Sequence, residues 1–344
     1  MVSIQILLIG VLALSISAII TRSLLPWVIR SSLRSGITAI DAHKPNKPKI
    51  AEPGGLASLI SFIFTILIII FIWELSNPNT QDFETLLAGL LSIVIAGLIG
   101  FLDDVFKIRW RDKILLGFLP AIPLMALKVG KSSIDLGILG VLDLGHLMEL
   151  PIVGYINLYS LVIIPLAINF AFNSFNMLAG FNGLEAGNGV ISLSIILFLS
   201  LFVDTSGIIT LFVTSLLGGS LILLKYNWYP AKTLIGDTGT LTLGTGIVTA
   251  LIIGNMDRLA IGLFGIHFIN FMLFLLYLYT RQTAKIASID QDGYILAPCP
   301  YTVYWLIPYF RRVTEKQNVL IILIIHAIIA ITVLLFSIPF FSGI

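Results

Sequence analysis

The stretch FNSFNMLAGFNGLEAGNG, from Phe172 to Gly189, contains four asparagines and no basic residue in a very apolar chain. Asn173 and Asn176 are three residues apart and would share one face of a helix. Asp237 adds a carboxylate in the later sequence GDTG. An amide oxygen of Asn176 and a carboxylate oxygen of Asp237 would suit a hard cation such as Mg²⁺, which keeps its other positions for water and phosphate. These residue types therefore indicate a site for Mg²⁺ and a phosphorylated ligand.

A second charged segment reads GFLDDVFKIRWRDK, from Gly100 to Lys113. Adjacent helical residues point about 100° apart, so Asp103 and Asp104 are predicted to have different roles rather than to chelate one ion together. Lys113 brings positive charge just beyond them. The two arginines of this segment have an ordinary alternative explanation, because basic residues are retained in cytoplasmic loops.

Each polar residue also has a purely structural explanation. An asparagine in a membrane span often only hydrogen-bonds a neighbouring helix. Several such segments on one side of a membrane favour function, however, because ionisable groups are expensive there. Asn188 is predicted to cap a helix. The four histidines lack the spacing of metal ligands and are predicted to pack or lie at interfaces; they are His43, His146, His267 and His326.

The composition sets the class of protein that carries these residues. The chain has 344 residues, 58% hydrophobic and 11% charged, with a mean hydropathy of +1.04. A soluble domain has about 25% charged residues, so this is predicted to be an all-α polytopic membrane protein with a single domain, residues 1–344. About 20 apolar residues are needed to span a bilayer. Ten spans are predicted: Met1–Thr21, Pro53–Trp73, Leu86–Leu102, Ile114–Leu127, Leu150–Asn173, Val190–Val203, Ile208–Leu224, Leu241–Met256, Leu259–Thr280 and Gln317–Phe341.

The basic residues predict the orientation of these spans. With the amino terminus outside, 17 of the 20 lysines and arginines, Lys285 among them, fall in cytoplasmic loops. The opposite side holds only Lys128, Lys131 and Arg258. This distribution follows the positive-inside rule and puts the asparagine-rich stretch at the cytoplasmic face. The lone Cys299 permits no internal disulfide, and there is no Walker or GxGxxG motif to indicate a soluble nucleotide-binding protein.

Taken together, the polar segments resemble the polyprenyl-phosphate N-acetylhexosamine-1-phosphate transferases, glycosyltransferase family 4, and within it the dolichyl-phosphate N-acetylglucosaminephosphotransferase branch of archaea and eukaryotes. The resemblance runs from about Asp41 to Tyr301. It rests on four matches in the family's order: GFLDDVFKIRWRDK, NSFNMLAGFNGLEAGNG, YNWYPAKTLIGDTG and the PCP of Pro298 to Pro300.

The resemblance implies a fold and an activity. Members have ten spans and a cytoplasmic active-site groove, and they use Mg²⁺, with Mn²⁺ as an alternative, to transfer a sugar phosphate from a UDP-sugar to a polyprenyl or dolichyl phosphate, releasing UMP. Carried onto this sequence, Asn176 and Asp237 would bind the metal, Asp103 and Asp104 would be the catalytic aspartate pair, and Lys113 would contact the diphosphate. Asn182 would contact the nucleoside. Glu52 and Asn173 match substrate-binding positions less closely.

Two departures from the family concern substrate recognition. Leu234 stands where the family has a phenylalanine that packs on uracil. After PCP, the eukaryotic Arg-His-Arg segment is replaced by residues that begin at Tyr301. Arg311 and Arg312 are the predicted substitutes for its phosphate and sugar contacts. These departures leave the UDP-sugar open, with GlcNAc favoured.

We therefore predict a transferase that starts lipid-linked glycan assembly, plausibly for protein N-glycosylation, in the cell membrane or an endoplasmic-reticulum-type membrane. Its relatives suggest a homodimer, and no nucleic acid is expected as a partner. Three alternatives stay open at this point: a secondary transporter, a non-catalytic relative that binds lipid, and a transferase for another UDP-sugar. Charge-free span centres argue against the transporter.

Overall fold

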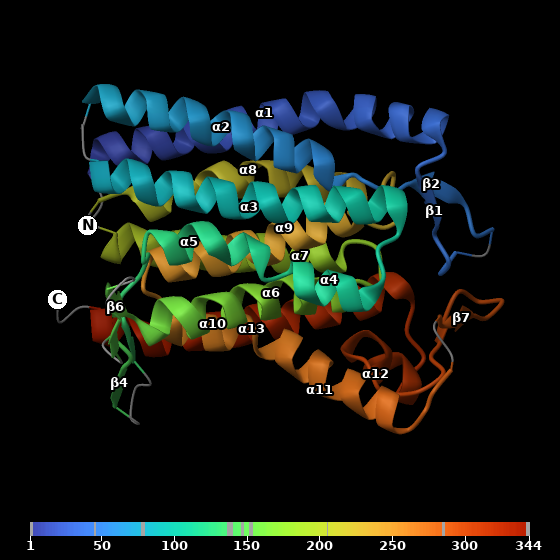
Figure 1. The fold of residues 1–344 in the computed structure, drawn as a ribbon. Coiled ribbons are helices and arrows are strands. Elements are labelled where there is room, and N and C mark those ends of the chain that lie inside the picture. Colours follow the sequence, from blue (N-terminus) through green and yellow to red (C-terminus); the bar gives the residue numbers. More distant parts are fainter. Residues whose placement is uncertain are drawn as a thin grey trace.

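The computed structural model describes residues 3–44, 46–76, 80–135, 140–145, 148–150, 154–204, 206–283 and 286–341. In this part of the chain the long helices run along a common axis and form one bundle, with short strands at its two ends (Figure 1). Lys285 and His146, for which the sequence predicted a cytoplasmic loop and an outer position, lie outside the described residues.

Helices account for most of the described chain. The long ones are α1 (Ile4–Ser35), α2 (Gly55–Ser76), α3 (Thr80–Phe106), α6 (Ile164–Met177), α7 (Leu184–Val203), α8 (Ile208–Asn227), α9 (Gly236–Ile253), α11 (Gly265–Tyr279) and α13 (Glu315–Phe341). The short ones are α4 (Trp110–Leu116), the 3₁₀ turn η1 (Leu119–Ala121), α5 (Ile122–Ala126), the π-helical turn η3 (Tyr159–Ile163), α10 (Asp257–Leu263) and α12 (Val303–Phe310).

The described strands pair as four short antiparallel hairpins. They are β1 (Thr38–Ile40) with β2 (Lys49–Ala51), β3 (Ser133–Asp135) with β4 (Val141–Asp143), β5 (Met148–Leu150) with β6 (Gly154–Ile156), and β7 (Ser288–Ile289) with β8 (Ile295–Leu296). The first hairpin matters for function, because it and the residues just after it form backbone hydrogen bonds with the segment that precedes α9. The backbone N–H of Leu234 donates to the Ala51 carbonyl at 2.8 Å, and the N–H of Gly54 donates to the Leu234 carbonyl at 3.0 Å.

The polytopic helical fold predicted from the sequence is confirmed. Among the described residues, eight helices are long and apolar enough to cross a membrane, and α10 with α11, bent by 51°, would make a ninth. The predicted fourth span, Ile114–Leu127, is not one helix. It is divided into α4, η1 and α5, which pack along α3 and α6 (Figure 1). Gly117 ends α4, while Pro120 and Pro123 lie in the first turns of η1 and α5, because proline cannot donate the backbone bond that would continue a helix.

Several predicted span boundaries also need correction. The span predicted to begin at Leu150 begins instead at Tyr159, because Met148–Leu150 and Gly154–Ile156 are strands. The span predicted from Val190 begins six residues earlier, at Leu184, and α7 therefore includes the polar end of the asparagine-rich stretch. Hydropathy alone assigned these polar and glycine residues to a loop, whereas their burial against neighbouring helices keeps them helical.

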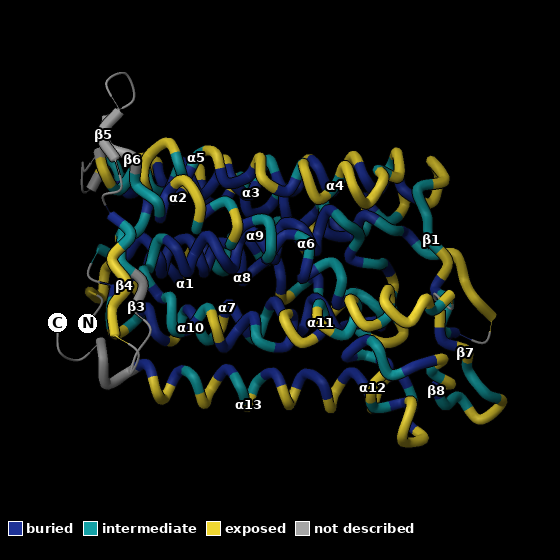
Figure 2. Tube along the Cα trace, turned by 60° about the horizontal axis from the view of Figure 1, so that its bottom comes forward, coloured by how far each residue is buried: buried dark blue, intermediate teal, exposed yellow. Residues whose placement is uncertain are grey.

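Burial separates a central helix from peripheral ones. In α9, 83% of the membrane-crossing window is buried, compared with 33% in α1 and in α13. Buried segments occupy the middle of the bundle, and α13 shows exposed residues along one side (Figure 2). The exposed side chains of α13 include Ile321, Ile324, Ile325, Ile328, Ile331 and Leu335. Such an apolar outer face suits contact with lipid.

The central helix also approaches α3 closely. A methyl group on Gly100 of α3 would lie 2.5 Å from the carbonyl oxygen of Asp237 in the first turn of α9. Only glycine permits this approach. The contact brings the end of α3, where Asp103 and Asp104 stand, against the beginning of α9.

Candidate active site

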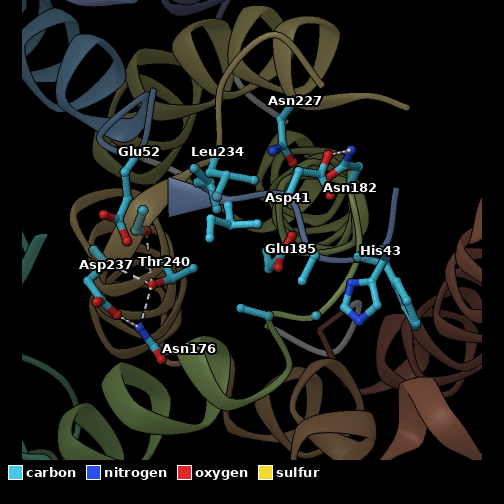
Figure 3. A pocket seen from close by; sticks show the side chains of 17 residues that line it. Asp41, His43, Glu52, Asn176, Asn182, Glu185, Asn227, Leu234, Asp237 and Thr240 are labelled. Carbon is cyan, nitrogen blue, oxygen red and sulfur yellow. Dashed lines mark hydrogen bonds between the residues drawn. The ribbon is translucent and has the colours of Figure 1, made fainter. Parts of the chain in front are cut away.

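A cavity of about 290 Å³ opens at the end of the bundle where α9 begins. Its walls come from the β1–β2 segment, the end of α6, the loop before α7 and the first turn of α9. In Figure 3, Asn176, Asp237 and Glu52 lie toward one side and Asp41 and Asn182 toward the other. The two sides have different chemistry and are described in turn.

The first turn of α9 is held by Asp104. One oxygen of this buried carboxylate accepts the backbone N–H of Asp237 at 2.7 Å, and the other accepts the N–H and the hydroxyl of Thr238 at 3.0 and 2.5 Å. Free N–H groups at a helix start favour such an anion. Gly236, with φ of +70°, makes room for it, because a methyl group there would lie 2.6 Å from an oxygen of Asp104. Asp104 therefore fixes the position of Asp237.

Asp103 points to a different partner. Its Oδ1 accepts the backbone N–H of Ile108 at 2.7 Å, and its Oδ2 forms an ion pair with Lys113. The Nζ of Lys113 also donates to Oδ1 of Asp237 at 3.0 Å. The lysine thus joins α3, α4 and α9, and the two adjacent aspartates have separate contacts.

Asn176 reaches the same carboxylate from α6. Its amide group donates to Oδ1 of Asp237 and to the hydroxyl of Thr240, the latter at 3.0 Å. If the amide turned over, its oxygen would face the carboxylate oxygen and the pair could share a cation.

The residues at this end fit a divalent cation. The ammonium of Lys113 pairs with two carboxylates, those of Asp103 and Asp237, and a third, that of Asp104, accepts the backbone N–H of Asp237. The described residues contain no group of three or more His, Cys, Asp or Glu side chains that could hold a metal ion. Asp237 and Asn176 would therefore supply only part of the coordination, and water or phosphate oxygens the rest, as is usual for Mg²⁺.

The other end of the cavity is a buried network that residue spacing did not reveal. The Nδ2 of Asn182 donates to Oδ2 of Asp41 at 2.9 Å, and its backbone N–H donates to Glu315 at 2.9 Å. Lys44 donates to Glu315 at 2.5 Å and lies 3.4 Å from Asp41. These four residues are each less than 9% exposed. Asn182 was predicted to contact a nucleoside. The other three members of the network were missed, because Glu315 lies 271 residues from Lys44 and no motif links them.

Other buried groups complete this end. Glu185, in the first turn of α7, lines the cavity and is 6% exposed. His43 also lines it, with its ring centroid 4.6 Å from that of Phe181. Burial, reinforced by the nearby ammonium of Lys44, lowers the pKa of His43 to about 4, so this imidazole is neutral at neutral pH.

The remaining predicted substrate residues divide between the cavity and its surroundings. Glu52 and Leu234 line the cavity, and Glu52 pairs with Lys107 at 2.8 Å. Asn173 lies beside it on α6, where its amide donates to the backbone and side-chain oxygens of Asn169, each at 3.0 Å. It does not contribute to the cavity lining.

The two arginines predicted to contact substrate stand farther off. Neither contributes to the cavity lining, and both are exposed. Arg312 pairs with Asp290 at 3.0 Å and with Asp292 at 3.1 Å, and its guanidinium lies 4.3 Å from the centroid of the Tyr294 ring. The guanidinium thus braces the β7–β8 hairpin in this structure. Arg311 ends α12 as its C-cap.

One sequence prediction is wrong. Asn188 does not cap a helix: α7 has Gly183 as its N-cap, and Asn188 is the fifth residue of that helix, fully buried, without a hydrogen-bond partner for either side-chain atom. The membrane histidines pack as predicted, His267 against Phe175 with ring centroids 4.8 Å apart, and His326 beside Ser192 at 3.0 Å.

The helical bundle has a polar cavity at one end, and aspartate, lysine and asparagine side chains cluster there. Such a cluster suits a divalent cation and phosphate, so the fold and the site together define a class of integral-membrane enzymes. Comparison with known proteins agrees. A sequence model of glycosyl transferase family 4 matches residues 86–255. That range includes every member of the cluster, from Asp103 to Asp237.

Individual relatives extend the match over most of the chain. A protein of Sulfolobus acidocaldarius, provisionally named UDP-N-acetylglucosamine–dolichyl-phosphate N-acetylglucosaminephosphotransferase, is 29% identical over 96% of this chain and 97% of its own. The enzyme of that name from Dictyostelium discoideum is 27% identical over 72% and 67%. The phospho-N-acetylmuramoyl-pentapeptide-transferase of Clostridium botulinum is 31% identical over 66% and 67%. The chain belongs to glycosyl transferase family 4, and it is a multi-pass membrane protein.

Proposed function

We propose that this protein transfers GlcNAc 1-phosphate from UDP-GlcNAc to a polyprenyl or dolichyl phosphate. The observation that carries the proposal is the convergence of Lys113 and Asn176 on Asp237 at the start of α9. The names of the archaeal and eukaryotic relatives, which specify UDP-N-acetylglucosamine and dolichyl phosphate, support the same substrates.

In the proposed reaction an oxygen of the lipid phosphate attacks the sugar-linked phosphorus of the UDP-sugar. The bond from that phosphorus to the bridging oxygen breaks, and UMP leaves with that oxygen. Two anions must meet, so neutralising charge and aligning the groups are the main tasks. A divalent cation held by Asp237 and Asn176, Mg²⁺ in our proposal, would bind diphosphate oxygens and stabilise the leaving UMP.

The protein's own groups divide the remaining work. Lys113 would move one of its N–H donors from Asp237 to the diphosphate, and its ion pair with Asp103 would hold it close. Asp104 would keep Asp237 in place through the backbone of α9. Asp103 is our candidate to orient the acceptor phosphate or to accept its proton.

We place the cavity at the cytoplasmic face of a cellular or endoplasmic-reticulum-type membrane, with the amino terminus outside, and propose a homodimer. The excess of basic residues in the predicted cytoplasmic loops supports the orientation. In our proposal the product is the first lipid-linked intermediate of a glycan for protein N-glycosylation.

The test uses the full-length protein purified in detergent. It is incubated with polyprenyl phosphate, Mg²⁺ and a panel of UDP-sugars, and released UMP is measured with and without a chelator. We expect UMP with UDP-GlcNAc, and its loss when the chelator is added. Folded protein that releases no UMP from any sugar would refute the proposed activity, while release from another sugar alone would correct the substrate.

A further inference from the structure

The side of the cavity away from Asp237 has the features of a subsite for a flat, hydrogen-bonding ring. Asn182 contributes an amide on this side (Figure 3), and Leu234, Ile235 and Phe181 add apolar surface to the cavity. This inference rests on the proposed function: if the diphosphate lies at Asp237, the nucleobase of the same ligand must extend toward Asn182 (Figure 3).

The structure fixes which way the Asn182 amide points. The Nδ2 of Asn182 donates to Oδ2 of Asp41 at 2.9 Å, so the amide NH₂, not the amide oxygen, faces Asp41. Lys44 lies on the same network, with its Nζ 3.4 Å from Asp41 and 2.5 Å from Glu315. The backbone bond from Asn182 to Glu315 holds the residue from its other side. The amide therefore has little freedom to turn over.

The amide oxygen is the atom left for a ligand. Among the described residues it accepts no hydrogen bond, whereas both the backbone N–H and the Nδ2 of Asn182 are engaged. An acceptor fixed at this place suits a ring that presents an N–H. Uracil has a hydrogen on N3, and cytosine has a lone pair there instead, so the two bases would meet the amide oxygen with opposite results.

We infer that Asp41 is a positioning residue that makes the site selective for uracil over cytosine, by holding the Asn182 amide with its oxygen toward the nucleobase. Leaving the acceptor opposite another lone pair costs the bond and its desolvation. We expect UMP to bind the wild-type protein roughly ten- to a hundredfold more tightly than CMP.

The test measures binding of UMP and of CMP to the purified full-length protein, in Mg²⁺, for the wild type and three variants. In Asp41→Asn the new amide can donate to the Asn182 oxygen, which releases the orientation. We expect the ratio of UMP to CMP affinity to fall to within about threefold of unity. Asn182→Ala removes the acceptor itself, and we expect the same fall in the ratio of UMP to CMP affinity. This variant replaces Asp41→Asn in the test if Asp41→Asn does not fold.

Glu315→Gln is the matched control. It breaks the ion pair with Lys44 in the same network but leaves the bond between Asp41 and the Asn182 side chain. Affinity for both nucleotides is expected to drop together, with their ratio preserved. If the network were merely structural, both substitutions would affect binding in the same way. Equal changes in the ratio of UMP to CMP affinity in Asp41→Asn and Glu315→Gln would therefore overturn the inference.

Two further outcomes separate this inference from the proposed function. A wild type that releases UMP from a UDP-sugar but binds CMP as well as UMP would overturn the inference and leave the activity standing. A wild type that prefers UMP, with the preference lost in Asp41→Asn, but that turns over no UDP-sugar would support the inference and refute the transferase.

Discussion

Two helices of this bundle begin in the same way at opposite ends of the molecule. At the start of α9, Asp104 accepts two backbone N–H groups and the hydroxyl of Thr238. At the start of α8, Asp204 accepts the N–H groups of Gly207 and Thr210 and the hydroxyl of Thr210, at 2.8 to 3.0 Å. Both carboxylates are buried, with 2% and 3% of their surface exposed. Both also satisfy N–H groups that a helix start leaves free.

The difference that matters for chemistry lies at the second position of each helix. The second residue of α9 is Asp237, whereas the second residue of α8 is Ile209, and in both helices the third is a threonine. Ile209 belongs to the apolar core, while Asp237 contacts Lys113 and Asn176. A capped helix start is thus a structural device that the chain uses twice, and it becomes a candidate catalytic site only where a second carboxylate projects from it.

The largest effect is expected from Asp237→Asn, which removes the charge that distinguishes the two helix starts. Without it, a cation is not held against the diphosphate, and UMP release should fall by at least about a thousandfold. Asp204→Asn is the matched control and should retain activity within about threefold. Comparable losses in the two variants would show that the difference between the helix starts carries no catalytic meaning.

A smaller loss, of roughly a hundredfold in UMP release, is expected from Lys113→Met. The methionine keeps the length of the side chain but not the charge that bridges Asp103 and Asp237. Lys107→Met is the control, since Lys107 stands near the same end of the bundle but is 62% exposed and pairs with Glu52. Retained turnover in Lys113→Met would remove the lysine from the mechanism.

Asp104→Asn and Asp204→Asn should cost similar stability, about 1 to 2 kcal/mol each, because each weakens one buried cap. Denaturant unfolding in detergent would measure this. UMP release should distinguish the two variants. We expect a loss of roughly tenfold for Asp104→Asn alone, because only this change misplaces Asp237. The shared capping role would be contradicted if only one of the two variants were destabilised.

The smallest effect on activity is expected from His43→Gln. Burial lowers the pKa of His43 to about 4 in the folded state, compared with about 6.5 in the unfolded chain. Between pH 4 and pH 6.5 the unfolded chain therefore binds a proton on this imidazole that the folded protein does not bind. The folded state is therefore destabilised as pH falls from 6.5 toward 4, by at most about 1.4 kcal/mol per pH unit. His43→Gln should flatten this part of the stability curve, measured by thermal unfolding against pH. An unchanged curve would show that another group titrates there.

Much of the Asp237 end could be predicted from the sequence, because its residues carry unusual chemistry for an apolar chain. Asp103, Asp104, Lys113, Asn176 and Asp237 stood out by type, and the structure brings them together. Sequence did not show that Asp104 is engaged as a helix cap, since a capping aspartate and a catalytic one look alike in a string of residues. Asp204 illustrates the same ambiguity.

The remaining features of the fold and the site depend on contacts that no local sequence pattern records. Hydropathy favoured a continuous span over Ile114–Leu127, although Gly117, Pro120 and Pro123 divide it. Arg312 was a plausible phosphate ligand by charge, but two nearby aspartates bind it in this structure. Long-range pairing decides such cases, and it depends on the three-dimensional arrangement of the helices.

The ion pair between Lys44 and Glu315 has a consequence for the order of assembly. Lys44 lies between β1 and β2, near the beginning of the chain, and Glu315 begins α13. During synthesis the segment around Asp41 and Lys44 must wait until nearly all other helices have been made before its partner emerges. The Asn182 side of the cavity is thus completed last, and an unfinished chain, even one already inserted in the membrane, lacks this part of the cavity wall in its final form.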